Sequence, residues 1–162
     1  MSLPVLAKVD PPEQYRVFCT NNPGACELEG ASVIPGSPDN QRALARINRG
    51  VNEETTYVSD WEFSGLDDVW NYPFQCHGDC EDFALEKRRR LVEEGFPGAA
   101  LNIATAIHKL DRFPHAVLLA ETSRGTWVLD NYSDALLCWD DTPYSFTRRE
   151  LPDGQWIKLG SR

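Results

Sequence analysis

The sequence lacks the features that would place a chain across a membrane or on a nucleic acid. No apolar run approaches the roughly 18 residues that a membrane-spanning helix needs. Lysine and arginine number 16 against 25 aspartate and glutamate residues, and a net charge of −9 offers no basic surface for nucleic acid or anionic lipid. Internal repeats, low-complexity tracts and a recognisable signal peptide are also missing. We therefore expect neither nucleic acid nor membrane insertion among the partners.

The composition that remains is that of a globular chain with a substantial core. The 162 residues are 41% hydrophobic and 10% aromatic. A chain of this length is sufficient for one hydrophobic core, and we expect a single domain over residues 1–162.

The most distinctive stretch is His-Gly-Asp-Cys-Glu-Asp-Phe-Ala over residues 77–84. It places Cys80 at the start of a helix predicted to end before Gly95, because acidic residues favour the positive end of a helix dipole and glycine ends helices. Cys80, Ala84 and Lys87 share the face on which this helix packs. A thiolate at a helix N-terminus is stabilised and nucleophilic. A small buried cysteine is the alternative.

The remaining N-terminal half favours helices and irregular segments. Leu44, Ile47 and Val51 recur at helical spacing and predict a helix over residues 39–52, with Ser37 or Asp39 as its cap. The other segments predicted here are an extended stretch over residues 1–12, a short helix over 12–19, an irregular aromatic loop over 53–75 packed on the core helix, and one helical turn over 65–70.

The C-terminal half favours short strands, and the predicted class is α+β, with helices first and an antiparallel sheet packed on the helix that begins at Cys80. Alternating apolar residues and the turn between residues 122 and 125 give the evidence. The predicted strands cover residues 100–107, 115–121, 126–131, 136–139 and 155–158.

His115 and Asp130 stand on two strands that this turn joins. A two-residue loop at Thr122–Ser123 sets them directly opposite, and a four-residue loop leaves them one diagonal step apart, so their side chains meet in either register. Asp130 can then accept from one imidazole nitrogen while the other takes the proton of Cys80. A nucleophile, a base and an orienting acid are the groups of a thiol hydrolase. Taken singly, a structural histidine and a turn aspartate remain alternatives.

Three motifs together resemble a known enzyme family. They are Gly-Asp-Cys-Glu-Asp-Phe-Ala (78–84) with Lys87, Pro-His-Ala-Val-Leu (114–118) and Trp-Val-Leu-Asp-Asn (127–131). Over roughly residues 40–132 the chain is similar to the bacterial transglutaminase-like cysteine proteinases, the LapG-like family. The resemblance implies a papain-like, transglutaminase-core fold and a Cys–His–Asp triad, which falls on Cys80, His115 and Asp130.

The resemblance also implies calcium next to the nucleophile, held by the flanking acids Asp79 and Glu81, although the chemistry itself requires no cofactor. Carboxylate oxygens suit Ca²⁺, but two carboxylates need further ligands to complete a shell. A role only in favouring the helix start is the alternative for both acids. Cys76, His77 and Cys80 do not predict zinc, because no second cysteine or histidine pair stands near them.

These observations predict a cysteine peptidase or amidase that hydrolyses a peptide or amide bond of a protein substrate through a thioester. The expected oxyanion donors are the backbone N–H of Cys80 and a side chain, either Gln75 or Trp70. Three alternatives remain: acyl transfer to an amine as in transglutaminases, an arylamine-type acyltransferase, for which no phosphate-binding loop is visible, and a non-catalytic calcium-responsive binding module.

The five cysteines bear on the compartment. Cys19 and Cys26 flank a turn-forming segment and predict a local disulfide, which fits an oxidising compartment, whereas two free thiols would fit a reducing one. Cys76 could pair with Cys138, or with Cys80 under oxidation. Together with the family resemblance, the Cys19–Cys26 pair predicts a periplasmic or otherwise exported protein.

Overall fold

The architecture of the chain is that of an α+β protein, as predicted. A computed structural model describes residues 3–59, 69–73 and 77–160. The α-helices and strands of these residues, in chain order, are β1 (Val5–Val9), α1 (Glu13–Asn21), α2 (Pro38–Glu54), β2 (Thr56–Tyr57), β3 (His77–Gly78), α4 (Cys80–Glu93), β4 (Leu101–His108), β5 (Pro114–Thr122), β6 (Gly125–Asp130), β7 (Ser133–Cys138), β8 (Tyr144–Glu150) and β9 (Trp156–Leu159).

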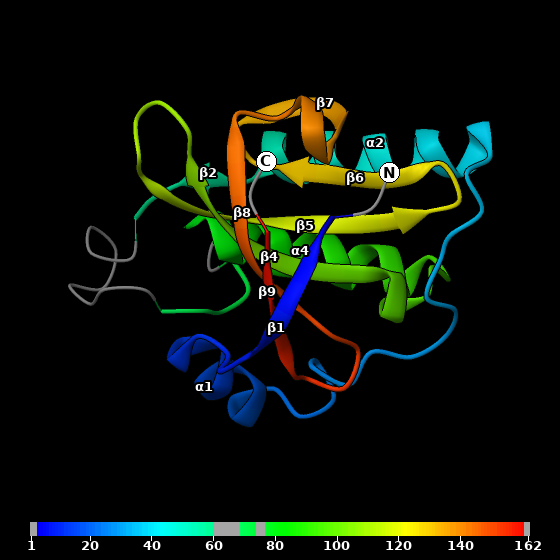
Figure 1. The fold of residues 1–162 in the computed structure, drawn as a ribbon. Coiled ribbons are helices and arrows are strands. Elements are labelled where there is room, and N and C mark those ends of the chain that lie inside the picture. Colours follow the sequence, from blue (N-terminus) through cyan, green and yellow to red (C-terminus); the bar gives the residue numbers. More distant parts are fainter. Residues whose placement is uncertain (1–2, 60–68, 74–76, 161–162) are drawn as a thin grey trace.

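Seven of the strands form one antiparallel sheet in the order β1-β9-β8-β4-β5-β6-β7. Helix α4 packs on β4 and β5 and helix α2 packs on β6 and β7, so both lie on the same face of the sheet (Figure 1). A second apolar cluster, which includes Leu3, Trp139 and Phe146, covers the other face. Because both faces are covered, the central strands read as nearly continuous apolar runs.

The predicted set of strands is incomplete at two places, one at an edge of the sheet and one inside it. Residues 1–12 include β1, which pairs with β9 and forms one edge, so the N-terminus belongs to the sheet. Strand β8 was not predicted, because Tyr144–Glu150 carries polar residues and charges on a partly exposed strand. Burial between β4 and β9 decides its conformation.

The predicted loop over residues 53–75 contains β2, which pairs in parallel with β3. Part of that prediction lies outside the described residues, including the helical turn proposed over residues 65–70 apart from its last two positions. Trp70 is buried in edge contact with Tyr15 of α1 and Trp156 of β9. Trp70 and Tyr72 therefore pack toward α1, whereas Tyr57 contacts Tyr132.

The predicted helix over residues 39–52 is confirmed as α2, and Ser37 is its cap, with Oγ accepting from the N–H of Asn40 at 3.2 Å. Cys19 and Cys26 form the predicted local disulfide. Among the described cysteines Cys80 and Cys138 carry free thiols, and Cys76 lies outside the described residues. No helix in the described part of the chain is both long and apolar enough to cross a membrane.

A buried ion pair joins α4 to the sheet and to the N-terminal helix. The guanidinium of Arg88 contacts Glu150 Oε1, and both side chains are almost fully buried. Tyr15 of α1 donates its hydroxyl to Glu150 Oε2 at 2.5 Å, and the N–H of Ile103 donates to Oε1 at 3.1 Å. These bonds satisfy a carboxylate that would otherwise be costly to bury.

We expect Glu150→Gln to lower the free energy of unfolding by about 3 kcal/mol, because it leaves the buried Arg88 charge uncompensated. Urea denaturation measures this. The matched control is Glu93→Gln, which removes an exposed partner of Arg89 and should change stability by less than about 1 kcal/mol. Equal midpoints for the two variants would contradict a structural role for the buried pair.

Candidate active site

Cys80 is the first residue of α4, and the turn before it is built to start the helix there. Asp79 is the cap: its Oδ1 accepts from the N–H of Cys80 at 2.7 Å, while Asp82 Oδ2 accepts from the N–H of Asp79 at 3.0 Å. The Asp79 side chain also accepts from the backbone N–H of Asp82, so these two residues form a reciprocal capping box. A Cβ at Gly78 would lie 2.9 Å from the Cβ of Asp82, so glycine is needed where the side chain of Asp82 folds back.

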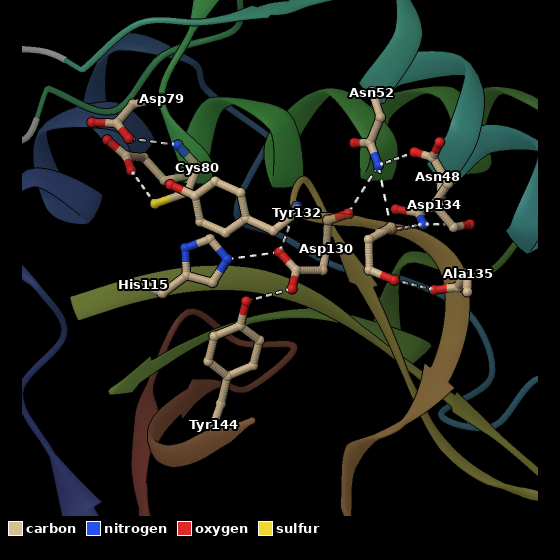
Figure 2. A network of polar contacts seen from close by, with 12 residues as sticks. Asn48, Asn52, Asp79, Cys80, His115, Asp130, Tyr132, Asp134, Ala135 and Tyr144 are labelled. Atoms are coloured by element: carbon tan, nitrogen blue, oxygen red, sulfur yellow. Dashed lines mark hydrogen bonds and ion pairs between the residues drawn. The ribbon is translucent and has the colours of Figure 1, made fainter. Parts of the chain in front are cut away.

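His115 and Asp130, from β5 and β6, form a buried hydrogen-bonded pair. Imidazole Nε2 lies 2.7 Å from Asp130 Oδ1, and each residue is about 5% exposed. Because a carboxylate only accepts, Nε2 carries the proton and Nδ1 is left as the basic nitrogen. Nδ1 lies on the side of the ring toward the Cys80 sulfur (Figure 2). The structure thus brings the three predicted residues to one place.

Strands β5 and β6 pair in the second of the two predicted registers, although the loop that joins them is shorter than the four-residue loop from which that register was predicted. Thr122 pairs with Gly125, and the ladder continues to Leu118 opposite Leu129. His115 and Asp130 are therefore offset along the strands by one diagonal step rather than directly opposite. Their side chains still meet, as expected for diagonal neighbours on adjacent strands.

Asp130 is held by more than His115. Its Oδ2 accepts from the Tyr144 hydroxyl at 2.6 Å, and Oδ1 also accepts from the N–H of Tyr132 at 3.1 Å. Asn52 of α2 donates to the Asp130 backbone carbonyl at 2.9 Å. Burial alone would raise the pKa of Asp130, but the hydrogen bonds from His115 and Tyr144 outweigh it and hold that pKa below its usual value. The carboxylate is therefore an anion at neutral pH.

Two tyrosines that were not among the predicted site residues enclose the imidazole. Tyr132 stacks on one face of His115 with centroids 4.8 Å apart and planes at 21°. Tyr144 lies at 5.0 Å and 31°, and Figure 2 shows it on the opposite side of the ring. The sequence offers one weak indication for Tyr132, which stands two positions after the predicted site residue Asp130. It offers none for Tyr144, because the contact of Tyr144 with the site depends on the pairing of β8 in the sheet.

The thiol of Cys80 does not have the environment that a helix N-terminus alone would predict. It donates to Glu81 Oε2 at 3.2 Å. Burial, followed by the carboxylates of Glu81 and Asp79, raises its pKa well above the usual value, against a smaller lowering by the backbone of Ala116. The expectation of a thiolate stabilised by the helix N-terminus is therefore wrong as far as the protein's own charges and burial are concerned. Two nearby charges and burial outweigh the partial charge of the helix end.

Cys80 and His115 open onto one cleft of about 650 Å³. Its described lining includes residues of α4, of the ends of β4 and β5 and of β8, together with the tyrosines Tyr57 and Tyr132. Of the predicted oxyanion donors, Trp70 lines the cleft, and Gln75 lies outside the described residues. The N–H of Cys80 donates to Asp79 in this state. A cleft with an apolar wall and a few convergent polar groups suits a peptide segment.

The acids beside the thiol form a compact cluster. Ligand atoms of Asp79, Cys80 and Glu81 lie within 4.8 Å of one another. Carboxylate oxygens at this spacing can share one hard cation such as Ca²⁺. The donor set therefore fits calcium, and carbonyl oxygens or water would complete the shell.

Lys87, on the packed face of α4, is buried without a hydrogen bond. Its side chain is fully inaccessible, Nζ has no hydrogen-bond partner among the described residues, and it lies 5.9 Å from the centroid of the Phe83 ring. Burial lowers its pKa to about 7, against the opposing effect of the Asp130 and Asp134 charges. The predicted packing of this helix face is confirmed, and it places the amine close enough to Asp130 for the charges of the two groups to interact.

A cysteine at the start of a helix, packed on an antiparallel sheet that carries a histidine and an aspartate, is the arrangement of the papain-like, transglutaminase-core class. The sequence profile of the bacterial transglutaminase-like cysteine proteinases, BTLCP, matches residues 5–162. The chain belongs to this family, and it is therefore a cysteine protease, a hydrolase with a protein substrate.

Solved structures of LapG from Legionella pneumophila are similar to this chain. The calcium-bound form is 25% identical with a TM-score of 0.64, and the EGTA-treated form is 26% identical with the same TM-score. Each match covers 78% of this chain and 74% of the other. A third LapG structure is 27% identical, with a TM-score of 0.63. No curated protein matches the chain.

Lys87→Met should raise the free energy of unfolding near pH 6, by at most about 5 kcal/mol. The unfolded chain keeps the lysine proton up to about pH 10.5, whereas the folded chain releases it near 7. Wild-type stability therefore rises between these two pH values, and the advantage of the variant shrinks over the same range. Urea titrations at several pH values test this, and a difference that does not change with pH would contradict a buried titrating amine.

Proposed function

We propose that this chain cleaves a peptide or amide bond of a protein substrate with Cys80 as nucleophile, His115 as base and acid, and Asp130 as the orienting carboxylate. The observation that carries the proposal is the hydrogen bond between His115 Nε2 and Asp130 Oδ1, with Nδ1 on the side of the thiol. It supports a single tautomer in which the basic nitrogen is available to Cys80.

The reaction proceeds in two halves. His115 Nδ1 takes the thiol proton, the sulfur attacks the substrate carbonyl, and the tetrahedral intermediate collapses to a thioester as imidazolium returns the proton to the leaving amine. Water then attacks the thioester with His115 taking its proton, and the released thiolate regains a proton from the imidazolium. Asp130 stays ionised throughout and stabilises the imidazolium. The oxyanion is bound by the N–H of Cys80, which must exchange its bond to Asp79 for the substrate.

We also propose that Asp79 and Glu81 hold a calcium ion. In this chain the support is their clustering with the thiol. Among similar proteins, LapG has been solved in calcium-bound and EGTA-treated forms. When bound, the ion supplies positive charge that offsets the two carboxylates next to Cys80.

Acyl transfer to an amine is the second candidate, because a thioester can react with a lysine amine as well as with water. Product analysis with and without an added primary amine separates hydrolysis from transfer. A non-catalytic binding module would show an unreactive thiol.

The Cys19–Cys26 disulfide supports a periplasmic or otherwise exported location.

Replacing His115 by Ala should slow alkylation of Cys80 by iodoacetamide at neutral pH by at least about tenfold, because the thiol loses the base that takes its proton. Peptide mapping by mass spectrometry follows Cys80, with Cys138 in the same sample as the internal reference. Equal labelling rates at Cys80 in both proteins would remove His115 from the mechanism.

Cys80→Ala should abolish proteolysis while the protein stays folded.

Calcium should raise the melting temperature of the wild-type protein, because an ion that binds only the folded state stabilises it. The double variant Asp79→Asn, Glu81→Gln should lose this shift, and calorimetric titration should show no binding. Glu53→Gln, an exposed acid on α2, is the matched control and should keep the shift. A wild-type protein that calcium does not stabilise would overturn the proposed site.

A further inference from the structure

Tyr144 reaches the candidate triad from a distant part of the sheet. It is the first residue of β8 and pairs with His108 at the end of β4. Strands β4 and β5 separate β8 from β6, which carries Asp130. The side chain is 4% exposed, and its hydroxyl lies 2.6 Å from Asp130 Oδ2. The contact therefore crosses two strands to arrive at one carboxylate oxygen.

The two oxygens of Asp130 have different partners. Oδ1 accepts from His115 Nε2 and from the N–H of Tyr132. Within the described part of the chain, Oδ2 accepts one hydrogen bond, from the Tyr144 hydroxyl. Burial and the adjacent carboxylate raise the pKa of Tyr144 far above neutrality, so its hydroxyl is protonated and donates. Without this donor, a buried anionic oxygen would lose its hydrogen bond and the carboxylate could turn.

The aromatic ring of Tyr144 also contacts the imidazole of His115. It contacts the face of His115 opposite Tyr132, so the imidazole is held between two aromatic rings (Figure 2). One side chain therefore constrains both members of the pair, the carboxylate through its hydroxyl and the imidazole through its ring.

We propose that Tyr144 is a positioning residue of this site, which fixes Asp130 so that Oδ1 faces His115 Nε2 and keeps Nδ1 as the basic nitrogen. Its effect on reaction rate rests on the proposed function of Cys80, His115 and Asp130. Its effect on the imidazole tautomer does not, because that depends only on the hydrogen bonds among Tyr144, Asp130 and His115.

The chain offers a matched control for the loss of such a bond. Tyr15 is also buried and donates to a buried carboxylate, Glu150 Oε2, at 2.5 Å, but it lies on α1 and does not contact His115 or Asp130. Tyr15→Phe and Tyr144→Phe thus remove the same kind of interaction. A purely structural role predicts equal consequences for the two variants, and a positioning role does not.

The experiment is nitrogen-15 NMR of labelled histidine in the wild type, Tyr144→Phe and Tyr15→Phe, with thermal unfolding to verify the fold. The chain has three histidines, so His115 can be assigned by substitution. We expect the Nε2–H tautomer in the wild type and in Tyr15→Phe, and a mixture of tautomers in Tyr144→Phe. Cys80 alkylation should slow by about 10- to 100-fold in Tyr144→Phe alone, the range expected for a hydrogen bond to a charged group.

An unchanged His115 tautomer in Tyr144→Phe, or an equal change in Tyr15→Phe, would overturn the proposal. If Cys80 proves unreactive in the wild type, the proposed function fails, and the tautomer still decides the role of Tyr144. The wild-type protein gives a further measurement that needs no variant. The Tyr144 hydroxyl proton should be protected from exchange with water, and fast exchange would contradict the bond.

Discussion

The candidate site depends on the way in which the carboxylate of Asp130 is held. It accepts from His115, from the N–H of Tyr132 and from the hydroxyl of Tyr144, while Asn52 of α2 holds its backbone carbonyl. A buried anion is tolerated only with such partners. Each donor comes from a different part of the fold, so the sheet, the β6–β7 turn and α2 must all be in place before the imidazole has one defined tautomer.

The electrostatics around the thiol oppose those around the histidine. Asp130 and the two enclosing tyrosines hold His115 in one tautomer, whereas Asp79 and Glu81 place negative charge beside the sulfur, which the proposed mechanism requires to become an anion. Asp79 has a second role as the helix cap, so it cannot simply be removed. A cation shared by the two carboxylates would reconcile both requirements, since it keeps the cap and offsets the charge.

Helix α4 connects the candidate site to stability because it carries residues that belong to each. Cys80 lies at its start, Lys87 lies in the protein interior on the side of Asp130, and Arg88 is paired with Glu150 in the core. Arg88 is stabilised by a partner carboxylate, while Lys87 has no hydrogen bond among the described residues. A buried lysine of this kind lowers stability at neutral pH, as functional sites often do.

Short-range patterns in the sequence determined the helix that begins at Cys80, the α2 helix, the β5–β6 hairpin and the local disulfide, because caps, periodicity and turn residues act over a few positions. They also led to Cys80, His115 and Asp130 through the two alternative registers. Only the tertiary structure decided which register forms, that β1 and β8 join the sheet, and that Tyr144 contacts Asp130. It also decided that burial and two carboxylates raise the pKa of the Cys80 thiol. The physical reason is that burial and charge depend on what surrounds a group in space, and residues distant in sequence supply most of those surroundings.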